Sequence, residues 1–509
     1  MVDRSNGRPP GLGAGGRGME RAREVASLVP GLPWGCGWKL VRLSLPSSSA
    51  QPDLVEDLAQ SAADLARRER RALRHSLIIF AVICTVFSIL PLVNAFRHAD
   101  GSKDYSLWYK VGQWVVQGQP LYPTQPGKPF PYMYPPFPAV AVFAPLSLLG
   151  YTATVLAMVV VNSLVWLGCI LLSVYLVTGR VRGQNPLLYI VPAAVVVPYV
   201  WDTYFLGQIN LSLLLMLLGA FAALKHRRQG LAGFLIALAA ACKAFPILAV
   251  PYLVYRRCWR ALASTLLSLI VLLVLLPAPF RGFERNLAEL RTWTAGMVFK
   301  ESGSTIAQRP GISFTYRNQS LLGLSHRLFR PVEAGDRSGK PFTVNVVDLG
   351  TRGAMTVFTL VALLLCGVYL LATRRPPAQS SQSAAAYEQS MLICLIVMFS
   401  PLAWTYYYCW LIFPFTAALA YIGRQPRGSR RRRIALIACG LSLAVLLSAI
   451  TQSFDQTTQA LGATVLGTII LYFTLAWMAR STSAAAQRPL VDCPQAQDAG
   501  AVGGRLGRG

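Results

Sequence analysis

The sequence predicts an all-α polytopic membrane protein, on three observations. The first is composition: 54% of the 509 residues are hydrophobic and only 14% are charged, which is too apolar for a soluble protein of this size. The second is the recurrence of apolar runs such as 76–96 and 261–277, close to the ~20 residues that a helix needs to cross a bilayer. The third is the position of the basic residues, which predicts the orientation.

The apolar runs predict a bundle of about 12 transmembrane helices with both termini in the cytoplasm. The expected spans are 76–96, 153–178, 187–201, 209–224, 231–243, 246–255, 261–278, 353–373, 389–403, 405–423, 434–452 and 461–479. Between these runs, Arg and Lys gather in short segments at 67–75, 225–228, 256–260, 374–375 and 424–433. The positive-inside rule assigns such segments to the cytoplasm.

This orientation sends the polar segments of the chain to the outer face. They are 97–135, 202–208, the neighbourhood of Lys243, 279–352, 400–404 and 453–460. The long segment 279–352 is rich in Arg, but long loops are exempt from the orientation rule. The formal net charge of +27 also raises the question of nucleic acid. No nucleic-acid-binding motif accompanies the charge, so we expect no nucleic-acid partner.

Two stretches allow more than one topology. The run 231–255 could be one helix, but Lys243 would then lie near the bilayer centre at a cost of about 2.5–3.5 kcal/mol. A break at 243–246 between two short helices places Lys243 at the outer interface instead. The stretch 136–150 is either a full span or a segment that dips in and returns, and the parity of the basic segments favours the dip.

The spans define one transmembrane domain, 76–480, which would carry the catalytic site and lies between two tails. The N-terminal tail 1–75 is expected to be cytoplasmic and mostly disordered, with a short helix at 53–75 whose acidic-to-basic order suits the helix dipole. The C-terminal tail 481–509 is expected to be disordered and cytoplasmic. The ten cysteines show no CxxC spacing and the four histidines are dispersed, so we expect no metal site and no cofactor.

Asp104 stands at the start of a helix-like stretch, 104–122, on the predicted outer face. Apolar residues recur there at helical spacing and Trp and Tyr flank them, so the stretch is expected to lie in the headgroup plane. Asp104 could simply complement the helix dipole. Acids are scarce, however: the chain has 21, and eight of them precede Arg71. Asp100 and His98 could tune Asp104, although a solvated loop is the simpler interpretation.

Five short motifs resemble glycosyltransferase family 87, membrane enzymes of the GT-C class. They are Asp104-Tyr105-x-x-Trp108-Tyr109 followed by Gly118 and Tyr122; Gly207-Gln208-Ile209-Asn210; Lys243-x-Phe245-Pro246; Arg317-Asn318-Gln319-Ser320-Leu321; and Ser400-Pro401-Leu402-Ala403-Trp404. Each motif alone is weak, but all five occur in the family's order. The resemblance covers roughly 76–480 and implies a GT-C-like bundle whose outer-face loops carry the active site.

The resemblance implies transfer of a sugar, usually mannose or arabinofuranose, from a polyprenyl-phosphate carrier to a hydroxyl of a glycolipid or glycan acceptor, with inversion. Such a displacement needs one general base, and that role falls to Asp104. The leaving phosphate needs cations and hydrogen-bond donors; Lys243, Arg317 and Arg327 are the candidates. A lipid-linked donor also explains why no P-loop or paired DxD motif occurs. The enzyme would work at the plasma membrane, on its extracytoplasmic side.

The remaining substrate-binding candidates are Gln208, Asn210, Tyr109, Asn318, Gln319, Trp404 and Tyr407. Each has a structural alternative: Gln208 and Asn210 could bond helices together, and Asn318 and Gln319 could cap the helix that follows. Lys243 could be a snorkelling lysine, and Asp202 is interpreted as a turn residue. Family members often carry a His pair after the Ser-Pro-x-x-Trp element, whereas this chain has Tyr406, Tyr407 and Tyr408. Tyrosines donate hydrogen bonds but carry no positive charge.

A secondary transporter or lipid flippase is the alternative, because it also has about a dozen spans. Transporters of this kind show two similar halves with interrupted helices in matching positions. This sequence has one Lys-Pro break and no counterpart, and its polar motifs gather on one predicted face. A non-catalytic scaffold would not require Asp104 at all. These features favour the enzyme.

Overall fold

The computed structural model describes residues 52–97, 103–123, 130–302, 305–307, 309, 311–335, 342–374, 381–450 and 455–486. The chain separates into two compact units, Met1–Val82 and Ile83–Gly509. The described part of the first unit is helical, and helix α3 runs Pro52–Phe96. The predicted helix 53–75 and the first span are therefore one continuous helix. Most of the predicted tails, together with His98 and Asp100, lie outside the described residues.

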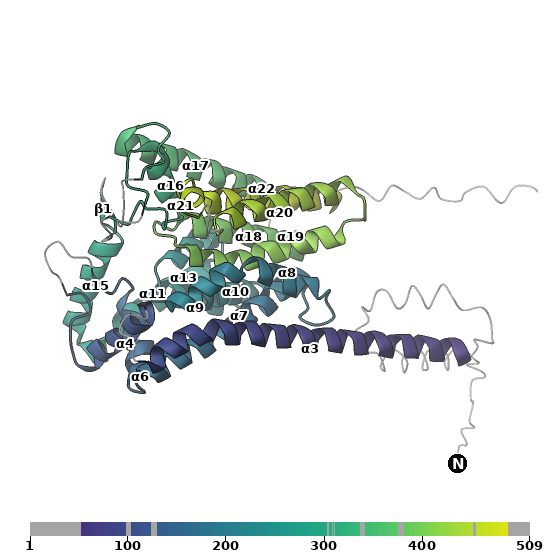
Figure 1. The fold of residues 1–509 in the computed structure, drawn as a ribbon, viewed down its shortest axis with the longest axis horizontal. Helices are drawn as coiled ribbons and strands as arrows, with labels where there is room; N and C mark the ends of the chain where they lie inside the picture. Colours follow the sequence, from purple (N-terminus) through teal and green to yellow (C-terminus); the bar gives the residue numbers. More distant parts are fainter. Residues whose placement is uncertain are drawn as a thin grey trace, which may run out of the picture. The chain divides into compact units, whose positions relative to one another are not determined.

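The second unit is a helical bundle in which α7 and α10 contact each other and α18 contacts α7, α19 and α22 (Figure 1). Its bundle helices are α7 Tyr151–Thr178, α8 Leu187–Val195, α9 Val197–Leu206, α10 Asn210–Lys225, α11 Gln229–Cys242, α12 Val250–Tyr255, α13 Trp259–Ile270, α17 Gly350–Thr373, α18 Gln382–Phe399, α19 Ile412–Arg424, α20 Arg430–Ser448 and α22 Ala463–Ala486. Helix α18 is central, since 72% of its most apolar 18-residue stretch is buried. Helix α17 is peripheral, since only 17% of the corresponding stretch is buried.

The number of spans differs from the prediction. Among the described residues, six helices are long and apolar enough to cross a membrane, or seven if α8 and α9, bent by 58°, form one broken span. The chain is thus a multi-pass membrane protein, but about 12 crossings are not confirmed. Several predicted spans correspond to shorter apolar helices, such as α10 and α11. At ~1.5 Å per residue, a 14-residue helix such as α11 is about 21 Å long and shorter than the ~30 Å hydrocarbon core.

Both ambiguous stretches resolve into short helices. Helix α11 ends at Cys242, Lys243 is extended with φ −156°, and a 3-10 turn η2 Phe245–Ala249 follows before α12. Pro246 explains the break, because it lacks an amide donor and its ring clashes with the preceding turn of a helix. In the other stretch, α5 Pro136–Pro138, the π-turn η1 Ala139–Phe143 and α6 Ala144–Ser147 form one short helical segment, too short to cross the core.

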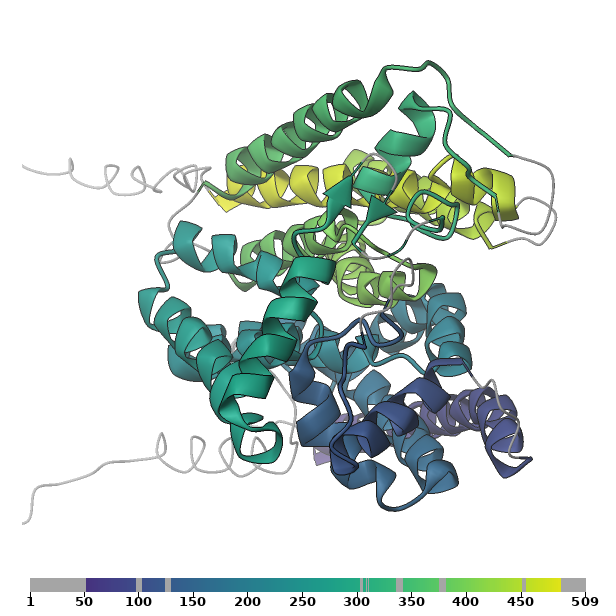
Figure 2. The ribbon, with the colours of Figure 1, turned by 90° about the vertical axis from the view of Figure 1, so that its left-hand side faces the viewer.

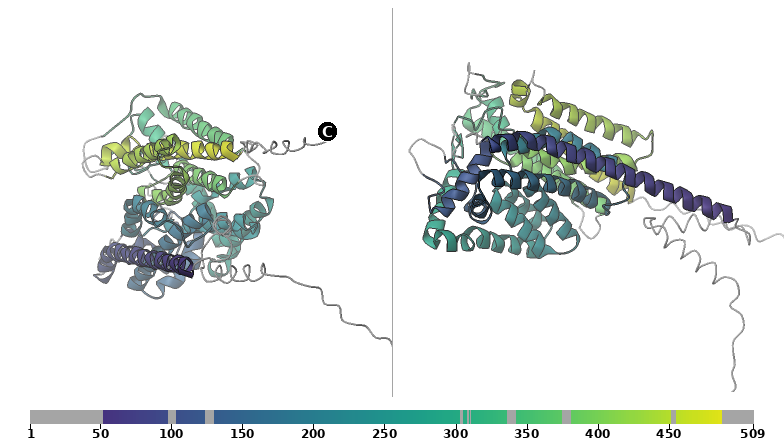
Figure 3. Two further views of the ribbon diagram at one scale, coloured as in Figure 1. Left: turned by 90° about the vertical axis from the view of Figure 1, so that its right-hand side faces the viewer. Right: turned by 60° about the horizontal axis from the view of Figure 1, so that its bottom comes forward.

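The second unit has two ends that differ in chemistry. One end, here called the loop end, holds α4 Lys103–Val116, α14 Ala278–Arg281, α15 Phe283–Met297, the antiparallel pair β1 Glu301–Ser302 and β2 Thr305–Ile306, α16 Leu321–Phe329 and α21 Asp455–Ala460, with η5 Thr405–Leu411 beneath (Figure 2). The other end, here called the basic end, holds the segments 179–186, 225–228, 256–260 and 424–433 (Figure 3, left). Within this unit, the basic segments 225–228, 256–260 and 424–433 therefore lie at the end opposite the polar motifs.

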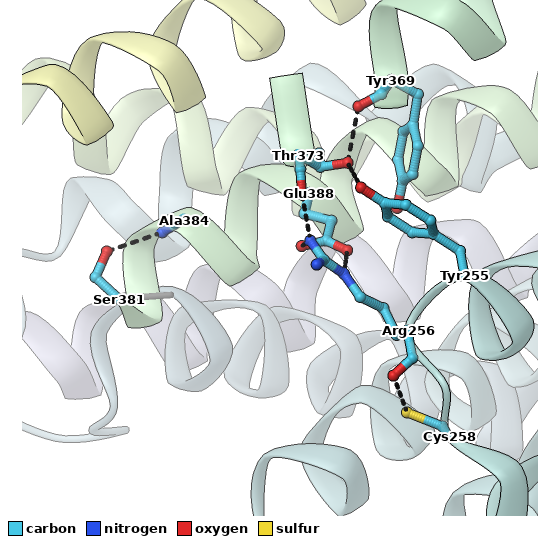
Figure 4. A network of polar contacts seen from close by, with 8 residues as sticks. All are labelled: Tyr255, Arg256, Cys258, Tyr369, Thr373, Ser381, Ala384 and Glu388. Atoms are coloured by element: carbon cyan, nitrogen blue, oxygen red, sulfur yellow. Dashed lines mark hydrogen bonds and ion pairs between the residues drawn. The ribbon is translucent and has the colours of Figure 1, made fainter. Parts of the chain in front are cut away.

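A buried ion pair joins three elements at the basic end. Arg256, after α12, pairs with Glu388 of α18, and their side chains are 9% and 7% exposed (Figure 4). The Arg256 Nη2 also donates to the Thr373 carbonyl at the end of α17, at 2.7 Å. Tyr255 Oη lies 3.2 Å from Thr373 Oγ1. The network therefore ties the α12–α13 turn to α17 and α18.

We expect Glu388→Gln to lower the free energy of unfolding by about 3–5 kcal/mol, because it leaves the Arg256 charge buried without its partner. The double variant Arg256→Met/Glu388→Leu removes both charges and should recover most of this loss. The apparent melting temperature of the detergent-purified protein measures both effects. Arg260→Met, at an exposed position of the same turn, is the control. A double variant no more stable than Glu388→Gln would contradict the prediction.

Candidate active site

Two aromatic side chains fix helix α4 against the turn that follows α9. Tyr105 Oη donates to the Tyr204 carbonyl at 2.7 Å, and Trp108 Nε1 donates to the Gly207 carbonyl at 2.8 Å. Both side chains are buried, with exposures of 1% and 0%. The prediction that the aromatic residues of this stretch lie among lipid headgroups is therefore wrong for these two, which anchor α4 inside the protein.

Gly207 allows this contact for two reasons. Its φ of +74° is in the left-handed region, which costs a residue with a Cβ about 1–2 kcal/mol. In addition, a Cβ at this position would lie 2.7 Å from Cδ2 of Tyr105. The glycine thus ends α9 and lets α4 come close, which places Asp104 beside Gln208.

Asp104, Gln208, Lys243 and Asn210 form a continuous hydrogen-bonded chain. Gln208 Nε2 donates to Asp104 Oδ2. Lys243 Nζ donates to Gln208 Oε1 at 3.4 Å and to Asn210 Oδ1 at 3.1 Å. The Gln208 side chain is 1% exposed and also accepts from Tyr134 Oη at 3.2 Å. Gln208 therefore orients the carboxylate on one side and holds the ammonium group on the other.

Three tyrosine rings surround the Lys243 ammonium. Its Nζ lies 4.4 Å from the ring centroid of Tyr407, 5.1 Å from that of Tyr406 and 5.2 Å from that of Tyr134. Electron-rich ring faces attract a cation at such distances. Phe245 packs on Tyr407 with ring centroids 4.7 Å apart, so the element after the break supports the same cluster.

Burial raises the pKa of the Asp104 carboxyl above its usual value, since desolvation disfavours the charged form. Nearby Lys243 and Arg309, the Gln208 hydrogen bond and Lys103 lower this pKa in part. A carboxylate with a raised pKa is a stronger base than an exposed one, and it still has an oxygen to accept a proton. The arrangement suits proton abstraction next to a fixed cation.

Arg309 is a member of the cluster that sequence reasoning missed. Its Nε contacts Met133 Sδ, and Met133 precedes Tyr134. Its charge lowers the pKa of Asp104. In the sequence, Arg309 is only one of the many arginines in the long segment 279–352.

The comparisons with known proteins identify the family. The model of Glycosyltransferase family 87 matches residues 132–401, more than half of the chain. The chain belongs to glycosyltransferase family 87. It is therefore a transferase. It is also 24% identical, over 371 residues, to a polyprenol-phosphate-mannose-dependent alpha-(1-2)-phosphatidylinositol mannoside mannosyltransferase of Mycolicibacterium smegmatis, a match that covers 67% of this chain and 74% of that protein.

Five residues predicted for this family 87 site come together at the loop end. Asp104, Gln208, Asn210 and Lys243 form the chain of hydrogen bonds, and Tyr407 packs on the ammonium. Asn210 makes a contact of the helix-bonding kind and also has an unused hydrogen-bond donor. Its carbonyl accepts from Trp410 Nε1 at 2.9 Å, while its own Nδ2 is buried with no hydrogen-bond partner among the described residues.

Asn318 and Gln319 hold loops together. Asn318 Nδ2 donates to the carbonyls of Ser313 and Pro401 at 2.8 and 3.0 Å, and Gln319 N donates to the Ala403 carbonyl at 2.6 Å. The cap of α16 is Ser320, which accepts from Gly323 N. The interpretation that Asn318 and Gln319 cap this helix is therefore wrong. Both residues instead join the two motifs Arg317–Leu321 and Ser400–Trp404.

The other predicted residues lie apart from the hydrogen-bonded chain. Tyr109 packs on Tyr151 with ring centroids 5.5 Å apart, Trp404 is half-buried, and Arg317 is exposed. The fully buried Arg327 donates to the carbonyls of Thr315, Asn318 and Ala460 at 2.7–2.9 Å. Its guanidinium is therefore bonded to the backbone. The expectation that Arg327 receives the phosphate is not supported.

Asp202 is not a turn residue, because α9 continues to Leu206. Its Oδ2 accepts from Thr405 Oγ1 at 2.6 Å, which ties α9 to the segment after Trp404. Burial lowers the pKa of Lys103, which is next to Asp104 in the chain, and the charge of Asp202 offsets part of this shift. Asp202 thus belongs to the border of the cluster.

We expect Gly207→Ala to lower transferase activity at least about 10-fold, because it strains the turn and displaces Tyr105, and small misplacements of reacting groups cost rate. The turnover of purified enzyme measures the effect. Gly118→Ala is the matched control, since Gly118 also has a positive φ but a Cβ there would meet no atom within 4 Å. If the two variants lose activity equally, backbone strain alone explains the loss.

Proposed function

We propose that this family 87 enzyme transfers a sugar, most simply mannose, from a polyprenyl-phosphate carrier to a hydroxyl of a glycolipid or glycan acceptor, with inversion. Asp104 acts as the general base. The observation that carries the proposal is the buried chain from Asp104 through Gln208 to Lys243, which holds a base and a cation in fixed relation. The relative from M. smegmatis, whose name specifies a polyprenol-phosphate-mannose donor, supports the donor class.

In the proposed reaction, the Asp104 carboxylate removes the proton of the acceptor hydroxyl as its oxygen attacks the anomeric carbon. The bond from that carbon to the phosphate oxygen breaks, and its electron pair stays on the phosphate. Lys243 stabilises the resulting negative charge. One displacement on one face of the sugar inverts its configuration.

The proposed location is the extracytoplasmic side of the plasma membrane. The basic end carries the short Arg-rich turns, which the positive-inside rule assigns to the cytoplasm. The Asp104 cluster belongs to the opposite, loop end. The same segregation argues against a transporter or flippase, whose substrate site is expected near the membrane midplane between repeats.

We expect Asp104→Asn to abolish transfer, at least about 10³-fold, because an amide cannot accept the proton, while expression and melting temperature stay near wild type. Transfer is measured with purified protein and a panel of radiolabelled polyprenyl-phosphate sugars, which also identifies the sugar. Asp348→Asn is the control: Asp348 is exposed and accepts from Gly350 N at 2.9 Å, a bond that Asn can replace. Turnover by Asp104→Asn like that of the wild type would remove the proposed base.

The pH profile tests the pairing of Asp104 with Lys243. The base works only when deprotonated, so kcat/KM should fall as the pH drops through the raised pKa of Asp104. Lys243 lowers that pKa. Lys243→Met should therefore move the acidic limb to higher pH, in addition to weakening carrier binding. An acidic limb that stays in place in this variant would show that the two groups are not coupled.

A further inference from the structure

Hydrogen bonds to hydroxyl groups of neighbouring residues hold the backbone of Arg309 in place. Its amide donates to Thr305 Oγ1 at 3.2 Å, and its carbonyl accepts from Ser313 Oγ at 2.6 Å. Ser313 Oγ in turn accepts from Ile306 N at 2.9 Å. The backbone of Arg309 is therefore fixed by strand β2 and the turn at 311–313. The Arg309 side chain extends from here to Met133. The next residue in the chain, Tyr134, donates a hydrogen bond to Gln208.

Among the described residues, neither cation of the cluster is neutralised by a carboxylate in a close ion pair. The ion pairs between these residues are Arg256–Glu388, Arg281–Glu289 and Arg285–Glu289, and none of them includes Lys243 or Arg309. The described contact of the Arg309 guanidinium is the uncharged Met133 sulfur. A partly buried cation is costly without a counter-charge, so this arrangement calls for an anion.

A second feature of the cluster also calls for an acceptor atom. Asn210 is fully buried, its Oδ1 accepts from Lys243, and its Nδ2 has no hydrogen-bond partner in the described part of the chain. A buried amide donor left unpaired costs about 1–3 kcal/mol. An anionic oxygen beside Lys243 would satisfy it.

We propose that Arg309 is the second cation of the phosphate site, and that Lys243 and Arg309 together keep the site electrically neutral before and after transfer. The inference rests on the proposed function. A sugar-phosphate diester carries one negative charge, which with the Asp104 carboxylate balances the two cations. After transfer, Asp104 holds the acceptor's proton and is neutral, and the phosphate monoester carries two negative charges. The negative charge has moved from the carboxylate to the phosphate, and the sum is unchanged.

The neighbouring charges do not alter this balance. Lys103, next to Asp104 in the chain, is offset by Asp202, and the charge of Arg317 acts on Lys103 but is not among the charges that shift the pKa of Asp104. Tyr134 and Tyr406 complete the surroundings and are neutral. With Lys243 as the sole cation, the buried site would carry one uncompensated negative charge both before and after transfer, which is unfavourable. After transfer both negative charges lie on the phosphate, where a second cation interacts with them most strongly. Arg309 therefore matters more for the dianionic product than for the monoanionic donor.

The test compares two ligands that differ by one charge. Farnesyl phosphate and its methyl phosphodiester have the same tail, and their direct binding to the detergent-purified enzyme at pH 7 is measured by calorimetry. Burial lowers the pKa of Lys243 to about 7, and the monoester is already largely dianionic at this pH. We expect the wild type to prefer the monoester. Arg309→Met should weaken monoester binding about 10-fold or more and diester binding less, since the removed charge interacts with two negative charges on the monoester and with one on the diester. Arg309→Lys should keep most of the preference.

Arg291→Met is the matched control: Arg291 is exposed on α15 at the same end, and its replacement should leave both affinities unchanged. If Arg309→Met weakens both ligands equally or neither, the assignment of Arg309 is wrong although transfer by the wild type continues. If the wild type binds neither ligand and transfers no lipid-linked sugar, the proposed function and this inference fail together. Melting temperatures of the Met and Lys variants show whether both remain folded.

Discussion

The arrangement of the candidate site depends on one side chain, the amide of Gln208. An amide both donates and accepts, so it can bond a carboxylate through its nitrogen and an ammonium group through its oxygen at the same time. Its donor goes to Asp104 and its acceptor receives Lys243 and Tyr134. A carboxylate in its place would repel Asp104, and an apolar residue would leave both charges unbridged. Gln208 thus separates the carboxylate of Asp104 from the ammonium group of Lys243 while keeping both in fixed positions.

Four segments far apart in the sequence meet around Gln208 and Lys243, and three of them are placed by a local backbone feature. Asp104 is positioned because Gly207 permits close contact with Tyr105. Lys243 is positioned because Pro246 ends the helical ladder after Cys242. Tyr407 comes from the 3-10 turn that begins after Trp404. Asn162 of α7 donates from its Nδ2 to the Gln208 carbonyl at 3.2 Å, so helix α7 also fixes the backbone of Gln208.

Much of this site could be predicted from the sequence because its charges are expensive in a membrane. Lys243 in an apolar run predicted a break, and the break is present. The scarcity of acids drew attention to Asp104. The number of spans could not be predicted in the same way, because hydropathy does not distinguish a short helix buried in protein, such as α10, from one that crosses lipid. Arg309 was missed for a related reason. The segment 279–352 contains many arginines, and only the hydrogen bonds of Thr305 and Ser313 to the Arg309 backbone distinguish this one.

The tyrosines that replace the family's histidine pair explain why the two cations matter here. A histidine beside the phosphate could supply a proton or a positive charge, whereas Tyr406 and Tyr407 supply neither at neutral pH. Their rings instead lie around Lys243 at 5.1 and 4.4 Å, where they favour its charged form. The positive charge of the site must then come from side chains outside this motif. In the proposed phosphate site, Lys243 supplies one charge from the break after α11 and Arg309 supplies the other from the loop end, so the substitution would move the charge without removing it.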